Sequence, residues 1–444
     1  MPPGRAPRLP IAGLAVYCLF LIPPVRAQSQ PGTAPQAGIT IDLKNALQRA
    51  RDNSQQLQSA ALEISLAAED RAQAKSALLP SLTYFNQYLY TQGNGTESGI
   101  FVANDGVHIY NSQAVVHQEL FAPERLADYR RTIAAQALAS AKRDIVERGL
   151  VATVVQSYYG VSAELRKLAN AQQALEEARR FLDVTQKLEQ GGEVAHADVL
   201  KAQLVLQQRQ RDVQDEQLAV DKARIALAVL LFPDYRTDYS VVDDLDSVGQ
   251  MPAYGEFEAS ALAKSPELRA AQESVRQEEF NKSIARAGYL PTLSFDYFFG
   301  INSRQFAVHD AEGFNRLGSV AQATLDIPVW NWGATRSKVR QADIRRQQAQ
   351  LDLELMRRQL ISSLHALYLE AQSALAQLDS LRRTVSDAAE SLRLTQLRYQ
   401  AGEVTVLEVV DAQSTLAQAR NSLDDGLSRY RQALAAIQTL TGTI

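Results

Sequence analysis

The sequence predicts a mainly α-helical protein with a transmembrane β-barrel contribution, built from a helix–β-hairpin–long helix–helix unit that occurs twice. Three observations lead to this fold class. The chain is similar to itself at a fixed offset, some helical stretches are far longer than a compact domain, and paired strands have one apolar and one polar face. Helices of that length favour an extended bundle or tube over a globule.

Residues 1–27 have the features of a cleaved signal peptide. Two arginines precede an apolar run from Ile11 to Ile22, and small residues follow it. The only cysteine, Cys18, lies within this segment, so we expect neither a disulfide nor a cysteine metal site in the mature protein. Residues 28–38 are predicted to form a disordered leader, and no later apolar stretch is long enough for a membrane helix.

The rest of the chain is predicted to be a tandem duplication, with a first structural repeat at residues 39–232, a linker at 233–255 and a second structural repeat at 256–444. Short motifs recur about 210 residues later with almost no drift in their offset. Chance similarity between alanine-rich helices would not keep this register. The matching segments are 54–57 with 265–268, 79–82 with 290–293, and 192–194 with 402–404.

Each repeat is predicted to contain a helix, a hairpin, a very long helix and a shorter helix. Pro80 and Pro291 mark the end of the first helix and the start of the hairpin, because proline blocks helix continuation. Gly191, Gly192 and Gly402 mark turns where a long helix folds back. The predicted helices occupy roughly residues 41–78, 124–189, 194–231, 257–289, 334–400 and 403–440.

The long helices are predicted to pack through coiled-coil seams, in which steps of four and three residues alternate. A helix of about 66 residues is roughly 100 Å long, so it must lie beside other long helices in an extended bundle. The seam of the first repeat contains Val151, Val154, Tyr158, Val161, Leu165 and Leu168. That of the second contains Leu360, Leu364, Leu367, Ala371, Ala374, Leu378, Leu381, Val385, Ala388, Leu392, Thr395 and Tyr399.

Both hairpins are predicted to have one apolar face and one polar face. Apolar side chains alternate with Thr292, Ser294 and Asp296 in one strand, and residues 321–327 return with the same alternation. The first hairpin is less regular, with apolar residues on one face of 82–90 and a return over 113–121. Strands of about ten residues suit a membrane barrel with a polar lumen. A soluble sheet resting on the helices is the alternative.

Four strands per chain cannot close a membrane-spanning barrel, so a chain that inserts must oligomerise. Three copies would supply a 12-stranded β-barrel above a trimeric α-barrel, to which each copy contributes equally. Trp330 and Trp332, just past the last predicted strand, would then meet the lipid headgroups. Packing against the helix end is the alternative for these tryptophans.

Composition and motifs argue against several classes of function. A net charge of −4 with nearly balanced signs indicates no polyanion-binding surface. The five histidines are scattered without ligand spacing, and we find neither a nucleotide-binding loop nor a serine-nucleophile motif. We therefore expect no enzyme activity, no cofactor, no metal site and no nucleic-acid partner.

The whole mature chain resembles the TolC family of outer-membrane efflux proteins. The most specific segment is residues 398–413, RYQAGEVTVLEVVDAQ, and a Leu-Pro-Ser/Thr-Leu motif begins both hairpins. The resemblance implies a homotrimeric channel in the cell outer membrane that extends into the periplasm. Such a channel is the exit duct for an inner-membrane pump (RND, ABC or similar), joined through a periplasmic adaptor (membrane fusion) protein. A periplasmic coiled-coil scaffold or adaptor is the alternative function.

The resemblance also places the channel constriction at the helix ends near the glycine turns. Glu408 and Asp411, three residues apart on one helix face, match acidic rings that line the constriction. Stabilisation of the helix dipole is the alternative role for these two acids. Asp198 and Tyr399 match residues that help to hold the tip closed.

One position departs from the family pattern. Val404 stands where the basic partner of the closed tip is expected, so either other contacts hold the tip shut or it is held less firmly. Arg398 and Lys201 are candidates for those contacts. Only the second tip carries the acid pair, so we expect the second repeat to move if the channel opens by moving one half of each subunit.

Overall fold

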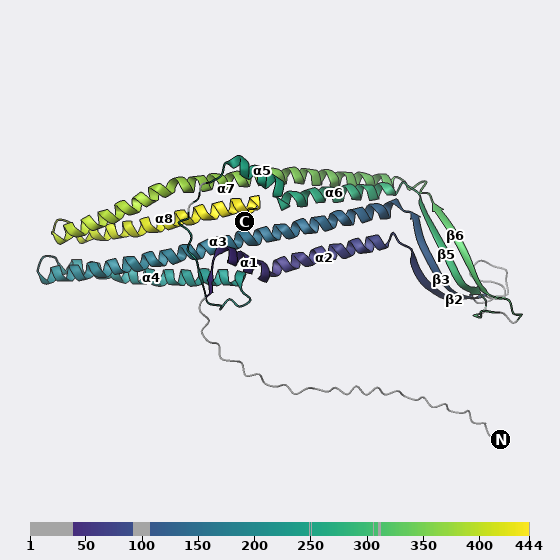
Figure 1. The fold of residues 1–444 in the computed structure, drawn as a ribbon, viewed down its shortest axis with the longest axis horizontal. Coiled ribbons are helices and arrows are strands. Elements are labelled where there is room, and N and C mark those ends of the chain that lie inside the picture. Colours follow the sequence, from purple (N-terminus) through teal and green to yellow (C-terminus); the bar gives the residue numbers. More distant parts are fainter. Residues whose placement is uncertain are drawn as a thin grey trace, which may run out of the picture. The chain divides into compact units, whose positions relative to one another are not determined.

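The structure is a computed structural model that describes residues 39–91, 107–247, 249, 251–304, 306–309 and 312–443. The predicted signal peptide and leader, 1–38, lie outside these residues. The described residues form long helices that fold back in pairs, a four-stranded sheet and a small two-stranded sheet (Figure 1). Among the described residues, no helix combines the length and apolar character needed to cross a membrane.

The elements occur in the same order in both halves of the chain. The first repeat contains β1 (Ile39–Ile41), α1 (Leu43–Asn53), α2 (Gln55–Ser76), β2 (Ser81–Thr91), β3 (Val107–Phe121), α3 (Pro123–Gln190) and α4 (His196–Leu231). After β4 (Tyr239–Val241), the second contains α5 (Tyr254–Lys264), α6 (Pro266–Ala287), β5 (Thr292–Ser303), β6 (Leu317–Asp326), α7 (Ala334–Gln400) and α8 (Val406–Thr441).

The first helix of each repeat is not continuous, and in this respect the prediction was wrong. Ser54 separates α1 from α2, and Ser265 separates α5 from α6, each with an extended backbone. Each serine hydroxyl accepts a hydrogen bond from the backbone N–H three residues later, at 3.2 Å, and so caps the second helix. Pro266 strengthens the break because it disfavours helical geometry in the residue before it.

The hairpins form one antiparallel sheet in the order β2-β3-β5-β6, so the two repeats pair through β3 and β5. Pro80 and Pro291 directly precede β2 and β5, while α2 and α6 end at Ser76 and Ala287. The register places Leu82, Val116, Tyr297 and Ala321 in one row, and Ser81, His117, Asp296 and Gln322 in the adjacent row on the other face. The predicted apolar and polar faces are therefore confirmed in these two rows, whereas Val115, Phe298 and Val320 make a further row on the polar face largely apolar.

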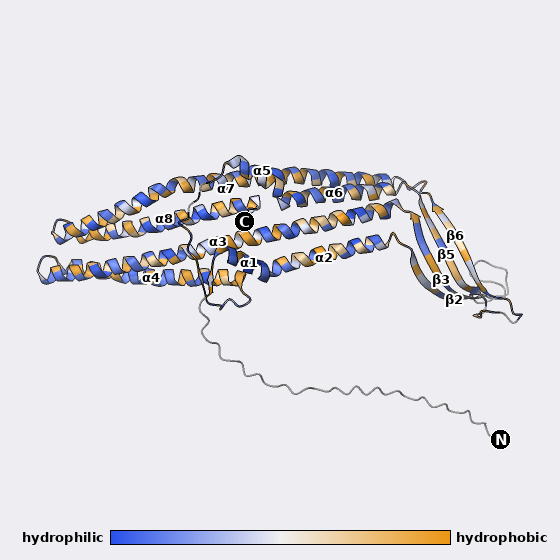
Figure 2. Cartoon of the chain, in the orientation of Figure 1, coloured by the Kyte–Doolittle hydropathy of each residue, from blue (hydrophilic) through white to orange (hydrophobic). Residues whose placement is uncertain are grey.

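The helices lie in the same order as the strands. In the half nearest the sheet, the order is α2, α3, α6 and α7, and each helix contacts the next. In the other half, the order is α4, α3, α8 and α7, again with contacts between neighbours. Apolar residues are distributed along the full length of these helices (Figure 2). Every residue of the predicted α7 seam is buried or half-buried. In α3 the seam holds except at Leu165, which is 38% exposed.

The segment predicted as a linker is bound to the helices. Its strand β4 pairs with β1, and α5 begins at its end. Arg166 of α3 donates hydrogen bonds to Asp243 at 2.5 Å and to Asp246 at 2.7 Å, and also contacts Asp424 of α8 at 3.4 Å. Tyr158 donates a hydrogen bond to the carbonyl of residue 242 at 2.7 Å. The linker therefore joins α3 of the first repeat to α8 of the second.

Candidate functional site: the helical tips

The turns at the two tips have the same backbone geometry. Gly192 and Gly402 have φ values of 77° and 75°, a left-handed conformation that favours glycine. Glu193 N–H donates to the Leu188 carbonyl at 2.9 Å, and Glu403 N–H donates to the Arg398 carbonyl at 2.9 Å. The Gly192 N–H also donates to the Glu189 carbonyl at 2.8 Å, and the Gly402 N–H to the Tyr399 carbonyl at 3.0 Å. Together these bonds form the Schellman motif that ends a helix. Gly191, in contrast, has an ordinary right-handed backbone.

The two tips differ in how the next helix begins. Helix α8 starts with a capping box, in which the Thr405 N–H donates to the Glu408 carboxylate at 3.2 Å. Helix α4 follows Ala195, which cannot cap it with a side chain, and its first residue, His196, contacts Glu189 at 2.6 Å. The start of α8 is therefore better capped than the start of α4.

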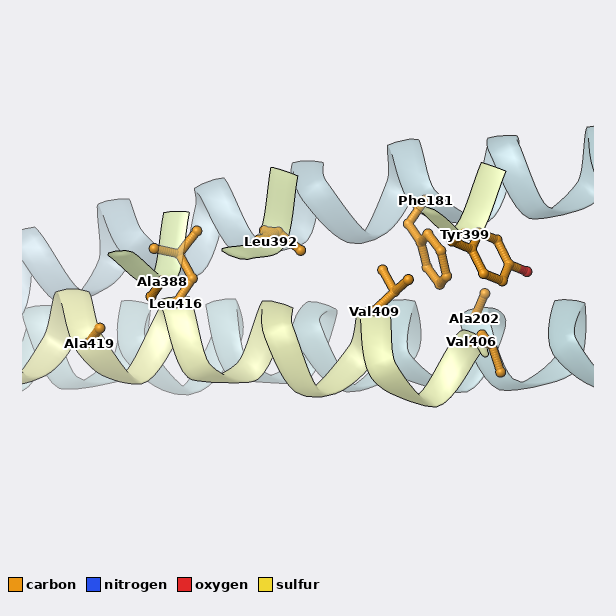
Figure 3. Packing of buried hydrophobic residues seen from close by; sticks show 9 residues of the cluster. All are labelled: Phe181, Ala202, Ala388, Leu392, Tyr399, Val406, Val409, Leu416 and Ala419. Atoms are coloured by element: carbon orange, nitrogen blue, oxygen red, sulfur yellow. The ribbon is translucent and has the colours of Figure 1, made fainter. Parts of the chain in front are cut away.

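An apolar cluster joins the two tips (Figure 3). Phe181 of α3 and Ala202 of α4 pack with Tyr399, Val406 and Val409 from α7 and α8. The rings of Phe181 and Tyr399 are 5.2 Å apart between centroids. The cluster stabilises contact between the repeats, because it removes apolar surface of both from water.

Val404 packs against this same cluster. A basic side chain at that position would have to leave the apolar contact or lose its hydration, which is unfavourable. The neighbouring arginine, Arg398, instead pairs with Glu403 of its own turn at 3.4 Å. Lys201 is exposed. The structure thus brings an apolar residue to the tip where a cation was expected.

Tyr399 is buried near the charge of Asp198. Tyr399 is only 3% exposed, and its hydroxyl forms no hydrogen bond of normal geometry with any described residue. Burial raises the pKa of Tyr399, and the negative charge of Asp198 raises it further, while Thr185 opposes the shift. Both effects favour the neutral form of Tyr399.

Glu408 and Asp411 are exposed on one face of α8, and no cation of the described residues pairs with either carboxylate. Glu408 also serves the capping box, which fits the helix-stabilising alternative. A cap uses one carboxylate oxygen and leaves the negative charge in place. The two acids can therefore attract cations from solution while Glu408 caps its helix.

Sequence reasoning missed a polar pair in the sheet. His117 of β3 and Asp296 of β5 lie opposite each other on the polar face, with 2.7 Å between Nδ1 and Oδ1. The alternation of the strands placed Asp296 on a polar face, but its pairing with His117 depends on contact between the repeats. Among the described residues, no group of three or more potential metal ligands occurs.

Comparisons with known proteins show which family and which solved structures this chain is similar to. The model of the family described as outer membrane efflux protein matches residues 46–231 and 259–443. The alkaline protease secretion protein AprF of Pseudomonas aeruginosa is 24% identical over 91% of this chain and 85% of its own length. The outer membrane protein TolC of Escherichia coli is 22% identical over 91% and 82%. The solved structure of the outer membrane protein VceC of Vibrio cholerae, 16% identical, superposes with a TM-score of 0.80 over 90% of this chain and 96% of that one.

Proposed function

The chain belongs to the family of outer membrane efflux proteins, and from this premise we propose how it assembles and where its channel narrows. It is an outer-membrane channel for efflux or secretion that extends into the periplasm. Members of this family are channels rather than enzymes, so transport needs no catalytic group from the chain. The energy for transport then comes from a partner protein, the inner-membrane pump.

The channel we propose is a homotrimer, and the observation that carries this proposal is the open sheet. Strands β2 and β6 are its two edges, each paired on one side only. Unpaired backbone groups are costly in a membrane, so the edge strands need partners. Pairing β6 of one copy with β2 of the next would close three four-stranded sheets into a 12-stranded barrel. Its apolar face would meet lipid and its polar face would line the lumen.

The helices support the same assembly. Large exposed apolar side chains are frequent on the helices that end each row, namely α2, α4 and α7. On α7 they recur at heptad-like positions, as expected for a seam that packs against a partner helix. Packing α7 of one copy against α2 and α4 of the next would bury these residues in a closed α-barrel. The residues on α7 are Ile344, Leu351, Leu355, Leu369, Leu394 and Leu397.

The helical tips are proposed as the constriction and gate. Three copies would bring together six carboxylates from Glu408 and Asp411, and this ring would favour cations. Asp198, Tyr399 and the apolar cluster would hold the two repeats together in the closed state. The turns at Gly191, Gly192 and Gly402 would form the surface that meets a periplasmic adaptor, which connects the duct to an inner-membrane pump.

The experiment that tests this function is reconstitution of the full chain. We expect outer-membrane fractions to contain a trimer that conducts ions in a planar bilayer. Recovery as a periplasmic protein that does not conduct would contradict the channel and favour the coiled-coil scaffold. Copurification after cross-linking identifies the adaptor and the pump.

A further inference from the structure

The junction between β6 and α7, residues 329–340, exposes an unusual combination of apolar and basic side chains. Val329 is 87% exposed, Trp330 75% and Trp332 90%. Large apolar side chains that cluster on a protein surface usually mark a site that a partner or a membrane covers. They lie between the last strand of the sheet and the first turn of a long helix, where a barrel leaves the membrane.

The backbone of this junction holds both tryptophans in place. Trp332 has a φ of 55°, the only positive φ of a non-glycine residue among those described, and Gly333 follows with 82°. Asn331 donates a hydrogen bond from its amide to the buried Thr335 hydroxyl. The two indole rings contact each other edge to face, 5.8 Å between centroids. A conformation that costs about 1 kcal/mol or more is thus maintained to present two adjacent indoles.

Basic residues follow directly on the helix. Arg336, Lys338 and Arg340 are exposed, and none forms an ion pair with any described residue. At 1.5 Å per residue they lie within about 10 Å of the helix start. The acid nearest to them on α7, Asp343, is already paired with Lys282 at 2.5 Å and with Arg346 at 3.2 Å. The three charges are therefore free to bind an external anion.

The equivalent junction of the first repeat lacks both features. Between β3 and α3 the chain has Phe121 but no tryptophan. Arg125 pairs with Glu119 at 3.3 Å and Arg131 with Asp128 at 2.8 Å, which leaves Arg130 as a single cation unpaired with any described residue, in place of a cluster of three. The combination of indoles and free cations is thus specific to the second repeat.

We propose that the β6–α7 junction binds the head group of an anionic phospholipid in the periplasmic leaflet of the outer membrane. Trp330 and Trp332 lie at the boundary of head groups and acyl chains, as indoles prefer. Arg336, Lys338 and Arg340 reach the phosphate from the aqueous side and gain from the negative surface. This inference rests on the proposed insertion of the sheet, and it gives each channel three lipid sites, one on each second repeat.

The chain suits a direct test, because it contains only two tryptophans and both belong to this junction. The trimer is reconstituted in phosphatidylcholine vesicles that carry an equal fraction of brominated phosphatidylcholine or brominated phosphatidylglycerol, and tryptophan emission is recorded. We expect the anionic lipid to quench with roughly tenfold higher apparent affinity, and added salt to reduce the difference. The R336Q/K338Q/R340Q variant should quench equally with both lipids.

The matched control is R125Q/R131Q in the first repeat, which should keep the lipid preference of the unchanged protein. Equal quenching of the unchanged protein by both lipids at low salt would overturn the lipid site while leaving the channel intact. Absence of quenching by either lipid, together with absence of conductance, would instead contradict the membrane insertion on which the site rests. A loss of preference in the control variant would also overturn the assignment to the second repeat.

Discussion

At the scale of single residues, glycines limit what the chain tolerates. Gly192 and Gly402 provide the left-handed backbone that ends α3 and α7, and open space surrounds both. Gly300 is restricted for a different reason. A Cβ atom there would lie 2.2 Å from the Ser112 carbonyl oxygen and 2.5 Å from the Cα of Gln113, so β5 approaches β3 too closely for any side chain.

We predict that Gly300→Ala destabilises the sheet by about 1–3 kcal/mol, because either the strand or its neighbour must move. The temperature at which the trimer dissociates on a gel, together with the yield in outer membranes, measures this loss. Gly318→Ala is the matched control, since Gly318 lies opposite Gly300 on β6 and no heavy atom lies within 4 Å of its added Cβ. Equal behaviour of the two variants would show that the close approach is not important.

At the scale of elements, polar side chains join the linker to α3 and α8. Arg166 reaches the linker and α8 at once, and Asn170 donates to Asp424 at 2.8 Å. Burial raises the pKa of Asp424, while Asn170 and Arg166 lower it. Nearer the tips the contact between the repeats becomes apolar. The contact between the repeats is therefore polar around Arg166 and apolar at the tips.

We predict that Arg166→Met costs about 2 kcal/mol of unfolding free energy, because Asp424 loses its cation in a mostly buried position. Limited proteolysis should also cut the freed linker faster. Arg179→Met is the control, since Arg179 forms an exposed pair one helical turn from Glu176, and a change within about 0.5 kcal/mol is expected. Equal proteolysis of the two variants would exclude a clamping role for Arg166.

This variant should also change how stability depends on pH. A carboxyl group with a raised pKa holds its proton more tightly in the folded state than in the unfolded chain, so acid favours the folded state. Removing Arg166 takes away one of the groups that lower the pKa of Asp424. The stability deficit of Arg166→Met should therefore shrink as the pH falls toward that pKa. Denaturant titrations at several pH values measure it, and a deficit that grows in acid would contradict this account.

At the scale of the whole molecule, the sheet and the rows of helices are open at both sides in the part of the chain that the structure describes. Its sheet ends in two unpaired strands, and its rows of helices end in exposed apolar seams. Both features call for a neighbour on each side, and a closed ring of copies supplies it. Under the proposed assembly, the channel would therefore form only between copies, because the described sheet is not closed.

We predict that Leu351→Glu on α7 prevents stable trimers, because it places a charge in an apolar seam between copies. Light scattering after size-exclusion chromatography in mild detergent gives the mass. Gln350→Glu is the control, since it adds the same charge at an exposed polar position on an adjacent face of the same turn, and it should leave the trimer intact. A trimer that survives Leu351→Glu would place the interface elsewhere.

We predict that Glu408→Gln/Asp411→Asn lowers the cation preference of the channel and weakens its block by trivalent cations. These changes remove the charge, while the amide oxygen of the new side chain at position 408 can still cap α8. Reversal potentials in planar bilayers under a salt gradient provide the measurement. Glu193→Gln, which changes an exposed acid of the first tip, should leave selectivity unchanged. Unchanged selectivity in the double variant would leave Glu408 with its helix-stabilising role only.

The sequence by itself determined the features that repeat at short range. The duplication, the helix lengths, the α7 seam, the two-faced strands and the glycine turns all follow from periodicity or from a residue's own backbone preference. The breaks at Ser54 and Ser265 also had local signals, a capping serine in both and Pro266 in one. They were missed because the helical pattern continues on either side of each break.

Only the tertiary structure decided how the two repeats meet. The pairing of β3 with β5, the contact of His117 with Asp296, the clamp around Arg166 and the packing of Val404 into the tip all join residues far apart in the chain. For the candidate site, the sequence indicated Glu408, Asp411, Asp198 and Tyr399, but not the apolar cluster that holds the tips together. Such contacts produce no periodic pattern in the sequence, because they depend on which faces of distant elements become neighbours once the chain has folded.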